Sequence, residues 1–377
     1  MNQKSILHII TGLNRGGAEK SLFSLTTTLQ NETNLQHLVL SLTTGGTLEQ
    51  KFNDSGILTF SLGLNKLRFI HAYKTLQYIL QNKQPVIIQG WMYHGNIISS
   101  LVKYIFNCKI PIVWNIRHSL YNIKHEKYFT RVVIKICSMI SINTDAIIYN
   151  SKKSASLHEK YGYKKNKTVV INNGFIIPNI ANKLKEQKKF RVMYNISKNN
   201  KIIGMVGNYR SFKDYPTCIK AFSKIKINFP DVTFVLVGIQ ISKENDELMR
   251  LIKLYQIEKD ILLLGEIKET ANIIKSFDIF MLSSMSESFP NVIAEAMSLS
   301  IPVVATDTGD VKRIVENTGL VVESRNPDSL GNACIKLLKY DSAKLSSLGN
   351  KARHRIQTNY SLAQMTIKYN ELYSSLI

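Results

Sequence analysis

The sequence contains little cysteine and no cysteine pattern. Its four cysteines, Cys108, Cys137, Cys218 and Cys334, are scattered, and no C-x-x-C pair is present. A disulfide framework needs paired cysteines and a structural zinc site needs closely spaced ligands, so the sequence suggests neither. We therefore expect a protein of a reducing compartment such as the cytosol.

Long apolar runs are also missing. No stretch of about 18 consecutive apolar residues occurs, and the opening MNQKSILHII has too short an apolar run for a signal peptide. We find no short-period repeat and no extended low-complexity tract. Because 44% of the 377 residues are hydrophobic, the chain is expected to fold as a soluble, unexported protein of about two domains.

Acidic residues are scarce, which leaves a formal net charge of +22. Residues 1–176 hold 21 Lys or Arg against 7 Asp or Glu, so the excess is concentrated in the first half. Such a charge suits nucleic acid, an anionic membrane surface or an anionic small molecule, and a lysine-rich genome would also explain it. Planar recognition of bases or phosphates favours arginine, whereas most of the basic residues here are lysines.

Short apolar runs alternate with segments of helical periodicity along both halves of the chain. In the first half the runs are residues 5–11, 37–43, 85–91, 110–116 and 145–151. In the second half they are residues 202–208, 232–238, 261–265, 278–284 and 302–307. This rhythm is typical of βαβ units, so it predicts two doubly wound domains with parallel sheets.

A polar, lysine- and asparagine-rich segment at 179–201, preceded by Pro178, predicts the domain junction. We place an N-terminal domain at 1–176, a second domain at 177–360 and an amphipathic final helix at 361–377. Two such domains facing one another would leave a cleft between the carboxyl ends of their strands, where ligands bind in open sheets.

Two glutamates, Glu287 and Glu295, stand on either side of a loop-to-helix junction, in SMSESFPNVIAEAM. Main-chain amides around Phe289, Pro290, Asn291 and Val292 belong to the predicted helix start. Amides at a helix start suit phosphate or hydroxyl oxygens and carboxylates accept from diols, which together describe a nucleotide sugar. Taken singly, a dipole-stabilised acid and a solvated helix residue would explain the two glutamates.

Other candidate residues follow predicted strands. Arg210 and Lys213 come after the strand that ends at Gly207, and two cations there can neutralise a diphosphate. The loop GLNRGGAEK fits neither G-x-G-x-x-G nor a P-loop, but Gly16 and Gly17 permit close approach of a ligand at a helix start. Solvated loop charges and a tight turn are the structural alternatives.

Aromatic and histidine side chains also follow first-domain strands, where they suit sugar stacking and hydroxyl contacts. They are Trp91, Tyr93, His94 and His118.

A basic set, Lys124, Lys127, Arg131 and Lys135, lies on one helical face, and an apolar set lies on another, Phe129, Val132, Val133, Ile136 and Met139. An ordinary surface helix or a docking face for anionic lipid headgroups would produce this pattern.

These motifs resemble the retaining glycosyltransferases of family 4, which have the GT-B fold of two facing Rossmann-like domains. The resemblance covers nearly the whole chain and is closest to the O-antigen and capsule branch. It is carried by GGAE at 16–19, WMYHGN at 91–96, His118, YNS at 149–151, NNG at 172–174, GNYRSFKD at 207–214 and ESFPNVIAEAM at 287–297.

The resemblance implies that the second domain holds a nucleotide-sugar donor and the first an acceptor. Glu295 would bind ribose hydroxyls, Glu287 and the following amides the donor sugar, and Arg210 with Lys213 the diphosphate. His118 would contact the donor sugar, while Gly16 and Gly17 would line the phosphate and acceptor side. The leaving phosphate itself would take the acceptor's proton, so neither a metal site nor a cofactor is expected.

Within this resemblance we expect a UDP-sugar donor and transfer of a hexose or N-acetylhexosamine. The acceptor would be a lipid-linked oligosaccharide, lipopolysaccharide or capsule chain at the cytoplasmic face of the inner membrane. The base would meet the segment LLLGEIKETANIIKSF, with Ile267 and Gly207 on the donor side.

Two positions depart from the family pattern. Asn208 stands where many members have arginine, and Phe175-Ile176 replaces a frequent Ile-Asp. Competing hypotheses are an epimerase or sugar-phosphate synthase of the same fold, and a basic nucleic-acid-binding protein.

Overall fold

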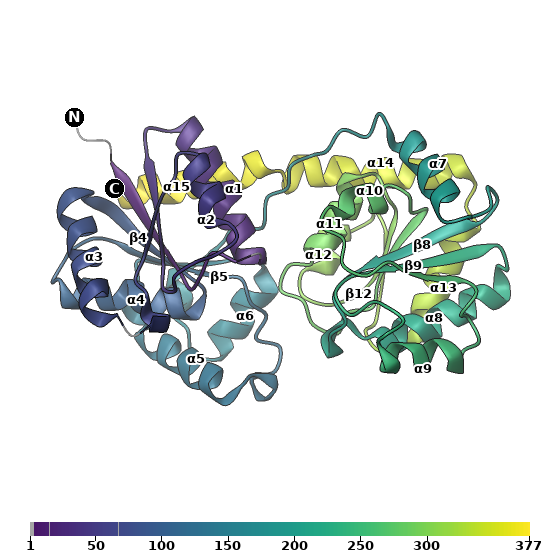
Figure 1. Cartoon of the computed structure of the whole chain (residues 1–377), viewed down its shortest axis with the longest axis horizontal. Coiled ribbons are helices and arrows are strands. Elements are labelled where there is room, and N and C mark those ends of the chain that lie inside the picture. The colour runs from purple at the N-terminus through teal and green to yellow at the C-terminus, as the bar shows by residue number, and fades with distance from the viewer. Residues whose placement is uncertain (1–3, 15, 67) are drawn as a thin grey trace. The chain divides into compact units, whose positions relative to one another are not determined.

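The computed structural model describes residues 4–14, 16–66 and 68–377. The chain divides into two compact units (Figure 1). The first unit runs to Gly174 and includes the C-terminal segment Leu362–Ile377, and the second unit is Phe175–Ser361.

The first unit contains a seven-stranded sheet in the order β3-β2-β1-β4-β5-β6-β7, with every pairing parallel. Its strands are β1 Ser5–Ile10, β2 Gln36–Ser41, β3 Leu58–Ser61, β4 Pro85–Trp91, β5 Ile112–Ile116, β6 Ala146–Tyr149 and β7 Thr168–Val170. The order reverses between β1 and β4. The strands that follow β1 are added on one side of the sheet, and those that follow β4 are added on the other side.

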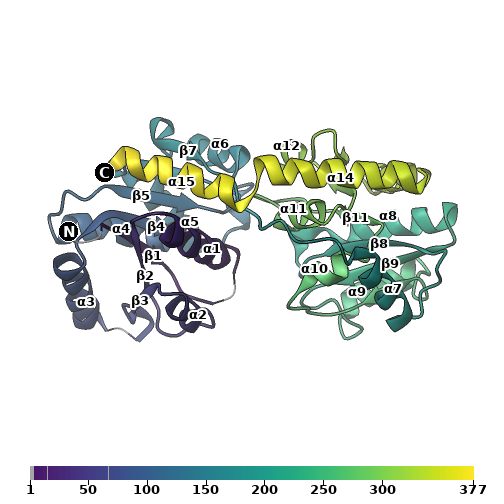
Figure 2. The same cartoon turned by 90° about the horizontal axis from the view of Figure 1, so that it is seen from above.

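Helices cover both faces of this sheet. They are α1 Gly17–Glu32, α2 Glu49–Asp54, α3 Phe69–Asn82, α4 Met92–Ile105, α5 Tyr128–Ile140, α6 Lys152–Lys160 and α15 Leu362–Leu376. One core lies between the sheet and α3, α4, α5 and α6, and the other lies under α1, α2 and α15. Figure 2 shows α15 beside the first-unit elements although it ends the chain.

Two buried tyrosines tie α15 to the sheet. The hydroxyl of Tyr369 accepts a hydrogen bond from Asn115 Nδ2 at 2.6 Å, and the Tyr373 hydroxyl donates to Gln89 Oε1 at 2.6 Å. Since Gln89 and Asn115 lie on the central strands β4 and β5, the last helix completes the polar interior of the first unit.

The second unit contains a six-stranded parallel sheet in the order β10-β9-β8-β11-β12-β13. Its strands are β8 Lys201–Val206, β9 Val232–Val237, β10 Ile261–Leu263, β11 Ile279–Leu282, β12 Val303–Thr306 and β13 Leu320–Val322. Its helices are α7 Lys183–Met193, α8 Tyr215–Asn228, α9 Asp246–Leu254, α10 Thr270–Ile274, α11 Asn291–Ser298, α12 Val311–Val315, α13 Pro327–Leu338 and α14 Ser342–Asn359.

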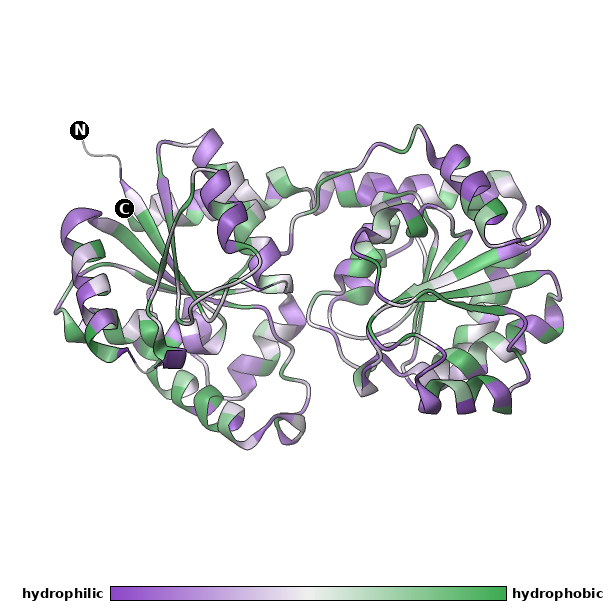
Figure 3. Cartoon of the chain, viewed as in Figure 1, coloured by the Kyte–Doolittle hydropathy of each residue, from purple (hydrophilic) through white to green (hydrophobic). Residues whose placement is uncertain are grey.

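The central strands of both sheets are buried along nearly their whole length because both faces of each sheet are covered. β1 and β9, for example, are buried at every position. Figure 3 shows the strands of both units mainly in the hydrophobic colour. The predicted α/β fold with two doubly wound parallel sheets is therefore confirmed.

The segment predicted as a polar junction contains a helix, α7. Only Phe190 of α7 is buried, and Leu184, Val192 and Met193 are exposed. The helix was not predicted from the sequence because a single buried side chain leaves almost no apolar periodicity in a polar segment.

Candidate active site

The strand order of the second unit reverses between β8 and β11, which are paired neighbours. The loops that follow these two strands therefore begin side by side at the carboxyl edge of the sheet. They carry Gly207–Asp214 and Ser283–Pro290, which include Arg210, Lys213 and Glu287 of the predicted site. The topology thus brings together residues more than 70 positions apart in the sequence.

Lys213 and Glu287 form an ion pair at this edge. The Lys213 Nζ lies 2.6 Å from Glu287 Oε1, and each side chain is only 13% exposed. The Ser284 hydroxyl donates to the same carboxylate oxygen at 2.9 Å. Sequence reasoning assigned the two side chains to separate groups of a ligand, whereas the structure pairs them with each other.

The main chain around the pair is held from two sides. The Ser283 hydroxyl donates to the Lys213 carbonyl at 2.7 Å, and the Glu287 N–H donates to Thr308 Oγ1 at 3.1 Å. Gly309 has a φ of +57°, and a Cβ there would stand 2.4 Å from the Glu287 carbonyl oxygen. The loop after β12 can therefore approach Glu287 only with glycine at 309.

The α11 helix begins beside Glu287 without a side-chain cap. Its three partly exposed residues are Asn291, Val292 and Glu295, and Glu295 follows the first two by four and three positions, so it lies on the same side of the helix as each of them. Amides of an uncapped first turn, with a carboxylate on the same face, can bind a ligand through phosphate and hydroxyl oxygens.

Phe289 and Pro290 were predicted to contribute main-chain groups at the start of α11, and the structure shows where their side chains lie. The Phe289 ring is buried against Phe175 and Tyr360, with ring centroids 5.9 and 5.8 Å apart. Pro290 is buried and has no N–H to donate. Neither side chain is available to a ligand, because the turn needs them as the apolar base under the helix start.

The remaining donor-side residues are spread along the same edge. Arg210 is exposed, and its side chain makes no ion pair with any residue that the structure describes. A Cβ on Gly207 would lie 3.3 Å from Lys213 Cε, so glycine there leaves room for the lysine stem. Ile267 is partly buried in the loop after β10, two strands away from β8.

In the first unit, Gly16 and Gly17 lie at the start of α1, at the carboxyl edge next to β1. A Cβ on Gly16 would stand 2.2 Å from Glu19 Oε2, so this carboxylate folds back over the helix start. Burial raises the pKa of Glu19. Glu19 was not among our predicted residues, although it ends the GGAE motif.

Trp91 is fully buried, and the prediction that it contacts an acceptor is wrong. Its indole N–H donates to His8 Nδ1 at 3.2 Å, and the Arg117 guanidinium lies 5.5 Å from the indole ring. As the last residue of β4, Trp91 still points into the core. The next residue, Met92, has a φ of +61° and turns the chain directly into α4.

His94 is exposed, and no hydrogen bond to its ring is found among the described residues. Tyr93 and His118 contact each other, with the Tyr93 hydroxyl 3.2 Å from His118 Nδ1. His118 Nε2 lies 3.3 Å from Glu126 Oε1. Burial lowers the pKa of His118, and the Glu126 charge opposes this shift.

Arg117 is a partly buried cation that sequence reasoning missed. Its Nη2 donates to Ser21 Oγ and to Asn173 Oδ1, both at 2.5 Å, and burial lowers its pKa. Within the described residues, no carboxylate forms an ion pair with it. Its position after β5 was visible in the sequence, but its burial was not.

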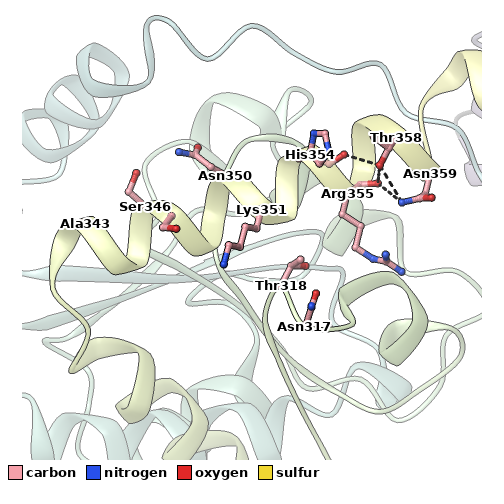
Figure 4. A pocket seen from close by; sticks show the side chains of 11 residues that line it. Asn317, Thr318, Ala343, Ser346, Asn350, Lys351, His354, Arg355, Thr358 and Asn359 are labelled. Atoms are coloured by element: carbon pink, nitrogen blue, oxygen red, sulfur yellow. Dashed lines mark hydrogen bonds between the residues drawn. The ribbon is translucent and has the colours of Figure 1, made fainter.

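A hollow of about 850 Å³ lies along α14 of the second unit (Figure 4). It is lined by polar residues such as Asn317, Lys351 and His354, and none of the predicted site residues lines it. Arg355 at its rim is held by Glu316 Oε2 at 2.6 Å. We place the site by the chemistry of the strand ends, where a paired lysine and glutamate meet an uncapped helix.

In the part of the chain that is described, no group of three or more His, Cys, Asp or Glu side chains could hold a metal ion.

Comparisons with known proteins agree with this geometry. The family model described as "Glycosyltransferase Family 4" matches residues 15–176, and "Glycosyl transferases group 1" matches residues 186–355. Together they cover both units. The chain belongs to the family 4 glycosyltransferases with the GT-B fold.

Among curated relatives, N-acetyl-alpha-D-glucosaminyl L-malate synthase of Bacillus anthracis is 26% identical over 51% of this chain and 50% of that enzyme. UDP-Gal:alpha-D-GlcNAc-diphosphoundecaprenol alpha-1,3-galactosyltransferase of Escherichia coli is 27% identical over 61% of this chain and 59% of that enzyme. The matches span half to three-fifths of the length of these two relatives.

Among solved structures, a glycosyltransferase from Rickettsia africae superposes with a TM-score of 0.83 at 22% identity, covering 100% of this chain and 99% of that one. HepE from Anabaena, solved in complex with UDP and glucose, gives a TM-score of 0.82 at 20% identity and covers 99% and 100%. At such identities these likenesses support the fold alone.

Proposed function

We propose that the protein is a retaining glycosyltransferase that moves a hexose or N-acetylhexosamine from a nucleotide sugar to a lipid-linked or polysaccharide acceptor. The observation that carries this proposal is the Lys213–Glu287 pair beside the uncapped start of α11. It offers a cation, a carboxylate and main-chain donors within one strand edge, as a diphosphate joined to a sugar requires.

In this proposal Lys213 exchanges part of its contact with Glu287 for the donor diphosphate. The amides of α11 and Glu287 then bind the donor sugar, and Glu295 accepts from the ribose hydroxyls. The leaving phosphate takes the acceptor's proton, so the step needs no resident metal. Neutralising the charge that develops on the diphosphate is the main contribution of Lys213.

The proposed donor is a UDP-sugar. Support comes from the name of the Escherichia coli relative, which specifies UDP-Gal, and from HepE, which was solved with UDP and with UDP-glucose. The names of two relatives specify undecaprenyl-diphosphate-linked sugars, and those of two others specify capsular polysaccharide or O-antigen biosynthesis.

The α5 helix supports a lipid-borne acceptor. Its apolar stripe faces solvent: Phe129 is 80% and Met139 66% exposed, and Tyr128, Val132 and Ile136 are exposed beside them. The buried residues of α5 are instead Ile134, Cys137 and Ser138. An ordinary surface helix buries its apolar face, so this arrangement favours the lipid-docking alternative.

The basic residues around α5 are less uniform than predicted. Lys124, Lys127 and Lys135 are exposed, but the Arg131 side chain donates to the Glu126 and Lys124 carbonyls. Neighbouring α4 adds exposed Tyr104 and Ile105. No described helix is long and apolar enough to cross a membrane. We propose that this surface touches an anionic cytoplasmic membrane face, where each lysine adds about 1 kcal/mol.

We expect one UDP-sugar to raise the melting temperature of the protein, and the variant Glu295→Gln to lose that response. A ligand that binds only the folded state at a hundredfold excess over its dissociation constant adds about 2.7 kcal/mol. The measurement is thermal unfolding with UDP-, GDP-, ADP- and dTDP-sugars. Glu244→Gln, an exposed glutamate after β9, is the matched control and should respond like the wild type. An equal response of Glu295→Gln would remove Glu295 from the donor site.

We expect the double variant Phe129→Ser/Met139→Ser to bind anionic vesicles about tenfold or more weakly than the wild type. Each buried apolar side chain of this size is worth about 1.5–3 kcal/mol when fully withdrawn from water. The measurement is the fraction of protein that co-sediments with vesicles of anionic phosphatidylglycerol and zwitterionic phosphatidylcholine. Ile227→Ser, an equally exposed apolar residue of the second unit, is the control. Unchanged binding of the double variant would favour a soluble acceptor or a soluble-substrate synthase.

A further inference from the structure

Four side chains of the first unit, Glu126, His118, Tyr93 and His158, form a continuous series of polar contacts that runs from the partly exposed Glu126 to the buried His158. Glu126 lies 3.3 Å from His118 Nε2, and His118 Nδ1 lies 3.2 Å from the Tyr93 hydroxyl. The same hydroxyl lies 2.8 Å from His158 Nε2, and His158 Nδ1 lies 2.8 Å from the Ser154 carbonyl. The residues come from α4, α6 and the loop after β5.

The position of one proton in this series is fixed at its buried end. A carbonyl oxygen can only accept, so His158 Nδ1 must carry a proton and donate to Ser154. His158 is fully buried, and burial lowers its pKa to about 4. It is therefore neutral at physiological pH, and its Nε2 is an acceptor.

This fixes the direction of the next two bonds. Tyr93 has one hydroxyl proton, and the only way to satisfy His158 Nε2 is for Tyr93 to donate it there. Burial raises the pKa of Tyr93, which keeps that proton in place. The Tyr93 oxygen can then only accept from His118, so His118 must carry its proton on Nδ1.

At the outer end, His118 Nε2 faces a carboxylate. Glu126 is held in position because the Arg131 side chain donates to the Glu126 carbonyl at 2.7 Å. An ionised carboxylate accepts only, so the contact is favourable when Nε2 also carries a proton. The proton on Nδ1 is fixed by Tyr93, so only Nε2 of His118 can gain or lose a proton without breaking the series. The His118 side chain is 33% exposed, so Nε2 can exchange this proton with solvent.

We propose that Tyr93 and His158 are positioning residues that hold the proton of His118 on Nδ1, so that Nε2 is the atom that meets Glu126 and, in turn, a ligand. This inference rests on the proposed function for the identity of the ligand, a donor sugar hydroxyl. The proton arrangement itself is a property of the free protein. A hydroxyl arriving at His118 would find one defined acceptor or donor atom in place of a mixture of two tautomers.

The test is nuclear magnetic resonance of the full chain labelled with ¹⁵N-histidine, at neutral pH and without substrate. The nitrogens of His118 are identified by comparison with His118→Gln. In the wild type we expect Nδ1 to be protonated, and in Tyr93→Phe we expect this preference to be lost. In His158→Leu the Tyr93 hydroxyl becomes free to donate to His118, so the proton should move to Nε2.

Tyr163→Phe is the matched control. It removes another buried tyrosine hydroxyl near His158, but this one donates to the Ile134 carbonyl at 3.2 Å and is not in the series. The control should leave the His118 nitrogens as in the wild type. An unprotonated Nδ1 in the wild type, or a Tyr93→Phe spectrum equal to that of the wild type, would overturn the proposal.

Activity gives a separate readout. With a donor found in the thermal screen, Tyr93→Phe should lower kcat about tenfold, the lower end of the usual effect of groups that orient a functional histidine, and leave KM within about twofold. A confirmed tautomer with no transferase activity in the wild type would reject the proposed function and keep the proton arrangement. A confirmed activity that Tyr93→Phe leaves unchanged would reject the positioning role.

Discussion

Replacement of Glu287 by glutamine is expected to slow sugar transfer by about 10²–10³-fold, the range found for a lost electrostatic contact at a reacting centre. Glutamine keeps the shape of the side chain and can still accept from Ser284, which now donates to Glu287 Oε1 at 2.9 Å. It removes the charge that holds Lys213 at 2.6 Å. The lysine then loses its orientation toward the diphosphate. The measurement is the single-turnover rate with saturating donor.

Stability separates a chemical effect from a folding effect. Both side chains are 13% exposed, so an unpaired lysine retains some access to water and the melting temperature should change by only a few degrees. Glu244→Gln makes the same chemical change at an exposed position of the same strand edge and should keep full activity. A Glu287→Gln enzyme that is folded and as fast as the wild type would contradict the proposed site.

The sequence predicted the residues of this site better than their mutual contacts. Glu287 and Lys213 each follow a buried strand, and parallel strands place such positions on one edge. The pairing of β8 with β11, which makes these two strands neighbours, depends on tertiary structure and leaves no trace in local composition. For the same reason the support from Thr308 and Gly309 was not predicted.

The predictable part of the fold is the part with strong local patterns. All ten apolar runs predicted as strands form strands, whereas three edge strands, β3, β7 and β13, were not predicted. Residues of β7 and β13 are all only partly buried, so their sequences carry weak apolar patterns. Their structure comes from pairing with an established neighbour.

Burial was the property that the sequence predicted least well around the candidate site. Trp91 stands at the carboxyl end of a predicted strand, where an aromatic side chain was expected to contact a sugar. In the structure it lies in the core and contacts His8 and Arg117. On α5 the sequence left a surface helix and a docking face as alternatives, and the structure shows the apolar stripe exposed. In both cases the periodicity was correct, but the direction toward the core depends on neighbouring elements.

Acidification is expected to unfold the first unit before the second. His8, His37 and His158 are fully buried in the first unit, while the second unit contains a single histidine, His354, which is exposed. Burial lowers the pKa of His37 and His158 to about 4 and that of His8 well below its usual value. His8 Nε2 and His37 Nδ1 are 2.9 Å apart, and the neighbouring His37 ring further lowers the pKa of His8.

These lowered pKa values determine how the stability of the first unit changes with pH. The unfolded chain binds protons near pH 6.5 and the folded unit only near pH 4, so stability is greatest above pH 6.5 and is lost as the pH falls through this window. Each pKa unit corresponds to 1.36 kcal/mol, so His37 and His158 together cost about 7 kcal/mol. This is comparable to the whole free energy of unfolding of a typical domain, about 5–15 kcal/mol.

Tryptophan fluorescence measures this prediction directly, because both tryptophans, Trp91 and Trp114, belong to the first unit. Denaturant unfolding at neutral pH and at about pH 4.5 should show the fluorescence transition move to lower denaturant, while the remaining circular dichroism signal follows the second unit. His37→Asn keeps an acceptor at the position of Nδ1 and should reduce the pH dependence by one proton. His71→Asn, at an exposed site, should leave it unchanged. A fluorescence transition that is independent of pH across this window would mean that the three rings accept protons without unfolding.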